Sequence, residues 1–246
     1  MGQLVNIAVA DGVATITLDS PANRNALSQQ LLADLHGALD VAETGQARVI
    51  VLTHTAPVFC AGADLKERAT GRVDSTSLVS AIQRLATTPA PVIAAVDGPV
   101  RAGGIGLMAA CDLVVVNSSI TFAFTEVRIG VAPAIITWPI LQRCGWSKLA
   151  APYLTGEVFD AAKALDMGLV THVTDDVTAT TAELCRNIML GGPYAVVATK
   201  TLLRRTHTIA ELQSLSESLF TGAEGREGMA AFTEKRQPSW LARRSP

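Results

Sequence analysis

The sequence lacks a long hydrophobic run. No apolar stretch approaches the ~20 residues that a membrane-spanning helix needs. The longest stretches, near residues 91–96 and 113–116, have the length of buried strands. The first residues show no basic segment followed by an apolar one, so we expect no signal peptide. These absences argue against a membrane protein.

Cysteine is scarce and follows no ligand pattern. The four cysteines form no Cys-x-x-Cys pair and have no companion histidines at metal-ligand spacing. We therefore expect reduced thiols in a cytoplasmic protein, and no metal site. Cys60 and Cys111 are expected to be small residues of the core.

A strong imbalance of charge is absent as well. The 20 basic and 22 acidic residues give a formal net charge of −2. A nucleic-acid-binding domain usually carries a basic surface, so this charge argues against nucleic acid as the main partner. With 49% hydrophobic and 17% charged residues, the chain is typical of a globular protein with a large core.

The residue pattern predicts a mixed α/β chain that ends in helices. A hairpin is expected over residues 4–19, where alternating apolar residues flank Asp11-Gly12. Buried strands are expected at 49–53 and 91–96. Helices are predicted between Ser28 and Gly45 and at 75–85, 134–144, 147–154, 160–167, 182–189, 193–205, 209–219 and 226–235.

Two loops of small residues each follow a predicted buried strand and lead into a predicted helix. One contains Ala61-Gly62-Ala63, and the other contains Ala102-Gly103-Gly104. Glycine lets a backbone approach a ligand closely, and a helix N-terminus presents unpaired N–H groups. Two such N–H groups that converge on one oxygen form an oxyanion hole, for which Ala63 and Gly103 are the natural donors. The alternative is that these glycines serve only tight packing.

One carboxylate, Glu126, lies in an otherwise apolar stretch twenty positions after Gly106. Burial among Phe122, Phe124 and Val127 would raise its pKa toward the range in which a group can carry a proton. Glu126 is thus a candidate acid and base beside a thioester carbonyl. The alternative is an exposed residue at the end of a strand.

Six motifs in order make the chain similar to the crotonase, or enoyl-CoA hydratase/isomerase, superfamily. Any one of them would be weak evidence, but their joint order and spacing cover nearly the whole chain. The motifs are Pro21-Ala22-Asn23-Arg24-Asn25-Ala26-Leu27, residues 59–66, residues 97–112, Thr125-Glu126-Val127-Arg128-Ile129-Gly130, residues 164–170 and residues 227–236.

The resemblance implies an α/β fold, a crotonase-like spiral of repeated β-β-α units with a C-terminal all-helical trimerisation region. Residues 1–190 would form the core that carries the acyl-CoA site, and residues 191–246 the oligomerisation region. It also implies a homotrimer, or a hexamer built as a dimer of trimers. The ligand would be an acyl-CoA thioester, so that coenzyme A is part of the substrate and no separate cofactor is expected.

By position, the resemblance assigns Ala63 and Gly103 to the oxyanion hole and Glu126 to acid–base chemistry. It also implies a set of substrate-binding residues: Arg24, Ala26, Leu27, Ala61, Asp64, Leu65, Lys66, Gly104, Thr125, Phe232 and Lys235. For two of these a simpler role is open. Asp64 could only cap the following helix, and Arg24 could be a solvated loop charge instead of a phosphate contact.

The sequence departs from the family pattern at Gly106, where typical hydratases carry the first of two glutamates. A hydratase branch with glycine at this position, and with a sequence similar to Glu126-Val127-Arg128-Ile129-Gly130, favours an enoyl-CoA hydratase-type lyase. An enoyl-CoA isomerase that uses Glu126 alone, or an acyl-CoA binder without catalysis, are the alternatives. A dienoyl-CoA isomerase is disfavoured, since Gly106 and Ala134 stand where it would need acids.

Overall fold

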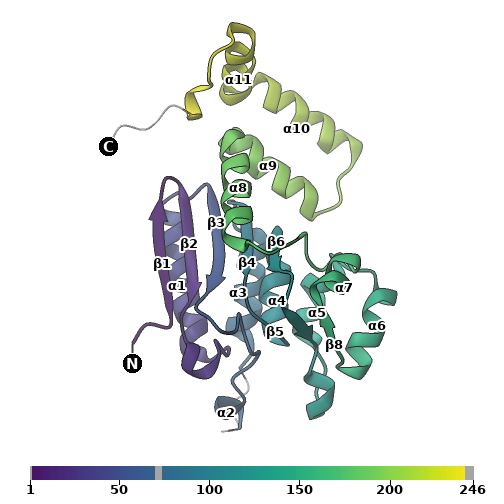
Figure 1. Ribbon diagram of the computed structural model, residues 1–246. Helices are drawn as coiled ribbons and strands as arrows, with labels where there is room; N and C mark the ends of the chain where they lie inside the picture. Colours follow the sequence, from purple (N-terminus) through teal and green to yellow (C-terminus); the bar gives the residue numbers. More distant parts are fainter. Residues whose placement is uncertain (1, 70–73, 242–246) are drawn as a thin grey trace. The chain divides into compact units, whose positions relative to one another are not determined.

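The computed structural model describes residues 2–69 and 74–241 of the chain (Figure 1). It divides into two compact units, one ending at residue 182 and the other beginning at residue 183. The strands are β1 (Val5–Ala10), β2 (Val13–Leu18), β3 (Val49–His54), β4 (Val92–Val96), β5 (Val100–Arg101), β6 (Leu113–Asn117), β7 (Thr121–Ala123), β8 (Val158–Asp160) and β9 (His172–Thr174).

Helices follow most strands and make up the end of the chain. The α-helices are α1 (Gln29–Thr44), α2 (Leu65–Arg68), α3 (Thr76–Thr87), α4 (Gly103–Ala110), α5 (Ala134–Leu141), α6 (Trp146–Thr155), α7 (Ala161–Asp166), α8 (Val177–Leu190), α9 (Pro193–Arg204), α10 (Ile209–Thr221) and α11 (Ala223–Glu234). Short 3-10 helices are η1 (Pro21–Asn23), η2 (Glu126–Ile129) and η3 (Ser239–Leu241). Among the described residues, no helix is both long and apolar enough to cross a membrane.

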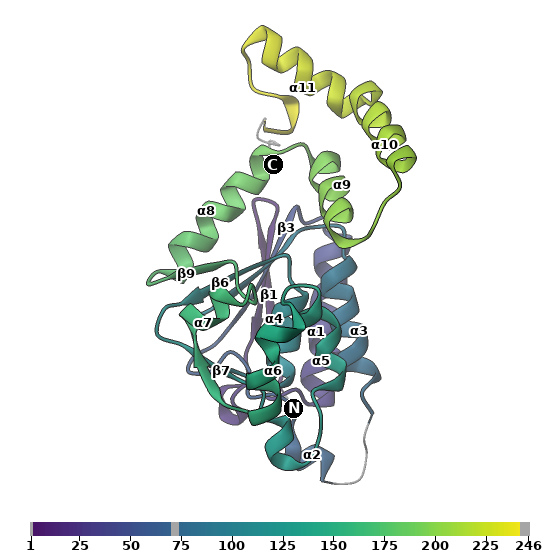
Figure 2. The same ribbon diagram turned by 90° about the vertical axis from the view of Figure 1, so that its right-hand side faces the viewer.

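The larger sheet of the first unit has the strand order β1-β2-β3-β4-β6-β9. Strands β1 and β2 form the expected antiparallel hairpin, and every later pairing in this sheet is parallel. All residues of β4 are buried, as its continuous apolar sequence predicts for a central parallel strand. Helices α1 and α3 lie side by side along one face of the sheet (Figure 2).

Helix α1 shows how local sequence places an element on the sheet. The hydroxyl of Ser28 accepts a hydrogen bond from the N–H of Leu31, which is the expected N-cap. Leu31, Leu35 and Leu39 recur at helical spacing and are completely buried. Gly45 follows the last residue of the helix, where the sequence predicts its end.

A second layer of short parallel pairings connects the loops between the main strands. Leu27 pairs with Ala63, Cys60 pairs with Val100, and β5 pairs with β7. Each turn of the chain therefore contributes one strand to the large sheet, one short strand or bridge to the second layer, and then a helix. This repetition confirms the predicted α/β class and crotonase-like spiral.

The structure also contains strands that the sequence pattern did not predict, among them β7, β8 and β9. Each has three residues, too few for a clear alternation of apolar and polar side chains. Their conformation comes from backbone pairing with β5, β7 and β6. Such a tertiary effect leaves no periodic signal in the sequence.

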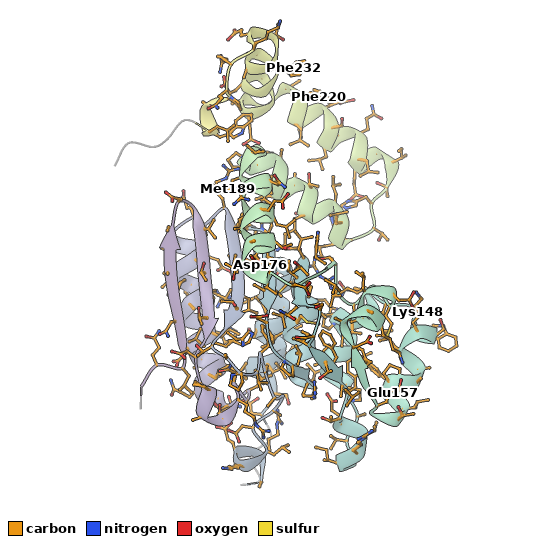
Figure 3. All side chains as sticks on the ribbon, in the orientation of Figure 1. Lys148, Glu157, Asp176, Met189, Phe220 and Phe232 are labelled. Atoms are coloured by element: carbon orange, nitrogen blue, oxygen red, sulfur yellow. The ribbon has the colours of Figure 1, made fainter. Side chains whose placement is uncertain are left out.

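The second unit contains helices α9, α10 and α11. The Glu224 carboxylate accepts hydrogen bonds from the N–H groups of Tyr194 and Ala195 at 2.9 and 2.8 Å, and so caps α9. Large apolar side chains remain exposed in this unit, including Phe220 at 64% and Phe232 at 86% (Figure 3). The roles expected for residues 1–190 and 191–246, with oligomerisation through the latter, stay predictions.

Candidate active site

The two glycine-containing loops lie next to each other because the turns of the spiral stack. The N–H of Leu27 donates to the carbonyl of Gly62 at 2.8 Å, and the N–H of Arg101 donates to the carbonyl of Cys60 at 2.9 Å. A methyl group at Gly103 would lie 3.9 Å from the backbone nitrogen of Ala63. The structure therefore brings the two predicted oxyanion-hole residues together.

Gly62 is required by the contact between these loops. Its φ of +93° is one that side chains rarely adopt. A Cβ at this position would lie 2.8 Å from the Cβ of Ala102 in the neighbouring loop. Ala102 is itself strained, with φ 47° and ψ −121°, a conformation that costs an alanine about 1–3 kcal/mol.

The backbone N–H groups of Ala63 and Gly103 have no hydrogen-bond acceptor among the described residues. Within residues 2–69 and 74–241, neither group donates a hydrogen bond to a backbone or side-chain acceptor. Gly103 is the first residue of α4, where N–H groups lack an intrahelical acceptor and the helix dipole is positive. This corner of the fold can hold negative charge on an oxygen atom.

Glu126 begins η2, three residues after the end of β7. Strand β7 runs parallel to β5, and the N–H of Ala102 donates to the carbonyl of Ala123 at 3.1 Å. Strands β5, β7 and β8 form a three-stranded sheet, the small sheet. Because the parallel strands β5 and β7 end at the same edge, Glu126 and the start of α4 lie at one edge of this small sheet. The pairing of β5 with β7 therefore brings the Glu126 carboxylate to the edge of the sheet at which Gly103 lies, although the two residues are far apart in sequence.

The environment of Glu126 is suited to proton transfer. Burial raises the pKa of its carboxyl above the usual value, against a smaller opposing effect of a backbone hydrogen bond. Its Oε2 atom is buried and has no hydrogen-bond partner among the described residues. A carboxylate with a raised pKa exchanges protons more readily near neutral pH.

The space that a first glutamate would need is filled by α5. A Cβ at Gly106 would lie 2.3 Å from Cγ2 of Ile136 and 3.3 Å from Cδ1 of Ile82. Both isoleucines are almost completely buried. Position 106 therefore presents an apolar, closely packed wall.

Tyr153 is a polar residue near this site that sequence reasoning missed. It lies in α6, and its ring centroid is 4.3 Å from that of Phe124. Its hydroxyl is buried and has no partner among the described residues. A lone tyrosine in a predicted helix carries no motif, so only the tertiary structure connects it to Glu126.

Asn25 is a second missed residue, and it supports the loop before Leu27. Its side chain is completely buried. The Oδ1 atom accepts from the N–H of Ser20 at 2.7 Å, while Nδ2 donates to the carbonyls of Val58 and Thr55 at 2.8 and 3.3 Å. These bonds tie together two consecutive turns of the spiral that lead into the site.

The predicted substrate-binding residues fall into distinct settings. Ala26 and Leu27 are buried, with Leu27 packed against Gly103. Asp64 caps α2 by accepting hydrogen bonds from the N–H groups of Lys66 and Glu67. Gly104 is buried and Ala61 and Thr125 are half-buried, whereas Arg24, Leu65 and Lys66 are exposed.

Phe232 and Lys235 belong to the second unit. Phe232 lies in α11 with its side chain largely exposed, and Lys235 directly follows the last residue of that helix with φ 55°.

Over the part of the chain that is described, no three histidine, cysteine, aspartate or glutamate side chains cluster closely enough to hold a metal ion.

Known proteins match this chain along nearly its whole length. The family model described as "Enoyl-CoA hydratase/isomerase" matches residues 8–243. Together with the spiral fold, this places the chain in the crotonase superfamily. It belongs to the enoyl-CoA hydratase/isomerase family.

Individual relatives agree with this assignment. The chain is 34% identical to the 2,3-dehydroadipyl-CoA hydratase of Escherichia coli K12, covering 94% of this chain and 96% of the relative. It is 31% identical to the enoyl-CoA isomerase/hydratase fer4 of Mycosarcoma maydis, covering 92% of each. A crystal structure of an enoyl-CoA hydratase from Mycobacterium avium is 41% identical with a TM-score of 0.76, covering 98% of this chain and 100% of that one.

Proposed function

We propose that this protein is an enoyl-CoA hydratase that adds water across the double bond of an enoyl-CoA thioester. The observation that carries the proposal is the oxyanion-hole geometry at the edge of the small sheet. There, two unpaired N–H groups meet at the start of α4, and a half-buried carboxylate follows the paired strand. The relative from Escherichia coli is named for a hydratase reaction, which supports the choice of hydration.

The two N–H groups of Ala63 and Gly103 donate to the thioester oxygen. That oxygen gains negative charge when water attacks the conjugated double bond, so donors fixed in advance stabilise the transition state more than the substrate. Removing one such donor typically costs roughly 2.7–4 kcal/mol of transition-state stabilisation. The donors are backbone groups on tightly packed loops and need no rearrangement.

Glu126 serves both proton transfers in this proposal. Its carboxylate takes a proton from the attacking water and then returns a proton to the α-carbon of the enolate. A single acid–base residue is sufficient because the proton taken in the first step is available for the second. The raised pKa of Glu126 suits both roles, since the group must accept and release a proton near neutral pH.

The remaining predicted residues bind the rest of the thioester. The exposed cations Arg24, Lys66 and Lys235 are suited to the phosphates of the coenzyme A part of the substrate. The other proposed contacts along the acyl and pantetheine parts come from Ala26, Leu27, Ala61, Asp64, Leu65, Gly104, Thr125 and Phe232. We further propose a homotrimer, or a hexamer of two trimers, because large apolar side chains of the helical second unit are exposed.

An enoyl-CoA isomerase is the second candidate. The observation that favours it is the apolar wall at Gly106 and Ile136, which stands where a second glutamate would be needed. Glu126 alone can move a proton between two carbons of the same substrate. The relative from Mycosarcoma maydis is named for both reactions. An acyl-CoA binder without catalysis is the third.

One experiment separates these functions. Loss of the conjugated-enoyl absorbance of crotonyl-CoA reports hydration, and conversion of a 3-enoyl-CoA reports isomerisation. Glu126→Gln should abolish whichever reaction occurs but retain binding of butyryl-CoA, which has no double bond. An unchanged rate in that variant would refute the role of Glu126, and binding without either reaction would identify a non-catalytic binder.

A further inference from the structure

Two buried polar atoms without partners lie on neighbouring elements of the site. They are Oε2 of Glu126 and the hydroxyl of Tyr153. A buried polar group without a hydrogen bond is costly, so such groups in folded proteins normally bind water or a ligand. The other buried atoms without partners belong to Thr88, Thr181 and His207, none of which is a residue of η2 or α6.

Packing fixes Tyr153 close to the carboxylate. The ring of Phe124, two residues before Glu126, lies 4.3 Å from the ring of Tyr153 at an interplanar angle of 54°. Helix α6 also packs against η2, which Glu126 begins. The aromatic contact holds the tyrosine ring in place, so its hydroxyl has a defined position.

The electrostatics agree with this proximity. Burial raises the pKa of Tyr153 to about 12, hydrogen bonding of its hydroxyl with the Thr137 side chain opposes that effect, and the negative charge of Glu126 adds to it. The tyrosine therefore stays protonated at neutral pH. Its hydroxyl can donate a hydrogen bond but does not act as an acid or a base.

Position 106 cannot supply a polar group here, because Ile136 fills the adjoining space. A water molecule that attacks the substrate must nevertheless be oriented by more than one contact. Glu126 provides one of these contacts. Among the described residues, Tyr153 carries a buried hydroxyl without a hydrogen bond of normal geometry, and it lies on α6, which packs against η2.

We propose that the Tyr153 hydroxyl binds the reacting water together with Glu126, in place of the glutamate that Gly106 replaces. This rests on the proposed hydratase function. The hydroxyl of Tyr153 donates a hydrogen bond to the water oxygen and keeps its proton throughout. Glu126 accepts one proton of that water while the oxygen forms its bond to the β-carbon.

The electron pair of the double bond then moves toward the thioester oxygen, where the N–H groups of Ala63 and Gly103 stabilise it. The proton on Glu126 passes to the α-carbon as the enolate collapses, so one water has been added and both side chains return to their starting state. Isomerisation uses no water. The role of Tyr153 therefore separates the two reactions.

The test compares Tyr153→Phe with wild type in both reactions. The variant keeps the ring against Phe124 and removes only the oxygen. The chain has two tyrosines, and Tyr194→Phe makes the same change at an exposed position in the second unit. Thermal unfolding of all three proteins shows whether either substitution alters the fold.

We expect Tyr153→Phe to lower kcat for crotonyl-CoA hydration about tenfold or more, which corresponds to one lost hydrogen bond. Its KM and its rate with a 3-enoyl-CoA should stay within about twofold of wild type. Tyr194→Phe should leave hydration unchanged. The ratio of hydration to isomerisation is the decisive readout, because a purely structural defect lowers both rates together.

Two results would overturn the inference while the proposed function stands. One is wild-type hydration in Tyr153→Phe, and the other is an equal fall in both reactions together with a lower melting temperature. A wild-type protein that hydrates no enoyl-CoA would instead refute the proposed function, and the assignment of Tyr153 with it.

Discussion

Ile136 occupies the space into which a side chain at position 106 would project. The two residues lie on α5 and α4, and the contact would be 2.3 Å from a Cβ at position 106 to Cγ2 of Ile136. Glycine at position 106 therefore leaves the room that the side chain of Ile136 fills. The absence of an acid at position 106 and the bulky apolar side chain of Ile136 on α5 depend on each other, because both side chains could not occupy the same space.

The first prediction tests this coupling by a double-mutant cycle. Gly106→Ala should destabilise the protein by about 1–3 kcal/mol through overpacking, and Ile136→Ala by about 2–5 kcal/mol through a cavity. The double variant should lose less than the sum, because the alanine at 106 enters the space that Ile136 leaves. Urea denaturation measures all three free energies of unfolding.

Gly37 provides the control for this cycle. It lies in α1 with no atom within 4 Å of a Cβ at that position. Gly37→Ala should stabilise the protein by roughly 0.5–1 kcal/mol, since glycine inside a helix is unfavourable. Strictly additive effects of Gly106→Ala and Ile136→Ala would contradict the proposed contact.

A second prediction concerns the contact between the two loops of the oxyanion hole. Gly62→Ala introduces a Cβ only 2.8 Å from that of Ala102 and requires a φ of +93°. We expect at least a hundredfold loss of kcat, because the N–H of Ala63 follows directly and would move. The assay is the same enoyl-CoA turnover used for wild type.

Ala102→Gly is the matched variant for that experiment. It removes the clashing Cβ and relieves the strained φ of 47°, so by itself it should keep wild-type stability or slightly raise it. Combined with Gly62→Ala, it should restore part of the lost rate. A double variant no better than Gly62→Ala alone would show that φ at position 62, and not the clash, controls activity.

The third prediction follows from the raised pKa of Glu126. The reaction needs the carboxylate form, so kcat/KM should fall as the pH drops through the pKa of this group. That acid limb should lie above 4.5, the ordinary value for glutamate. Assays after return to neutral pH exclude irreversible unfolding, and an acid limb at or below the ordinary value would count against a buried acting base.

The fourth prediction concerns His54, whose pKa is lowered from 6.5, mainly by burial, with smaller opposing effects of Thr55, Asp97 and Val58. Its Nε2 accepts a hydrogen bond from the N–H of Asp97 at 3.1 Å, which requires the unprotonated nitrogen. The unfolded chain therefore binds the proton more readily than the folded one. Stability from this group is complete above pH 6.5 and is lost as the pH falls below it.

Urea unfolding between neutral pH and pH 5 tests this for wild type and His54→Gln. The glutamine does not titrate, so the part of the pH dependence that belongs to His54 should disappear. An identical slope in both proteins would mean that other groups produce the effect. The position lies at the end of β3, just before the loop that leads to Ala63.

The fifth prediction addresses Asn25, which joins two consecutive turns of the spiral. Asn25→Ala should lower the free energy of unfolding by about 1–3 kcal/mol or more, since it leaves buried backbone groups unpaired. Asn23→Asp is the control. Asn23 accepts a hydrogen bond from the hydroxyl of Ser20, and aspartate keeps that acceptor, so its effect should stay within about 0.5 kcal/mol.

Much of the fold could be predicted from the sequence where an element has a strong local signal. The hairpin at Asp11-Gly12, the cap at Ser28 and the apolar run of β4 all depend on neighbouring residues. By contrast, β9 forms because the backbone of residues 172–174 pairs with β6. No pattern within those residues encodes that pairing.

The site divides in the same way. The small-residue loops and the isolated carboxylate of Glu126 are visible as motifs, and the structure brings Ala63 and Gly103 together. Tyr153 and Ile136 were not predicted, because their importance lies in what they touch. Ile136 matters only through its contact with Gly106, thirty positions earlier in the chain, and Tyr153 only through Phe124 and Glu126.

The stacked loops also bear on how such a site can change over time. Leu27, Ala63, Gly103 and Glu126 each come from a different turn of the spiral, and each turn is held by backbone pairing to the next. A substitution in one turn can thus delete or replace a chemical group without disturbing the frame that carries the others. Glycine at position 106, where typical hydratases carry a glutamate, is one such replacement. A scaffold of this kind can change its reaction by substitutions in one turn of the spiral at a time.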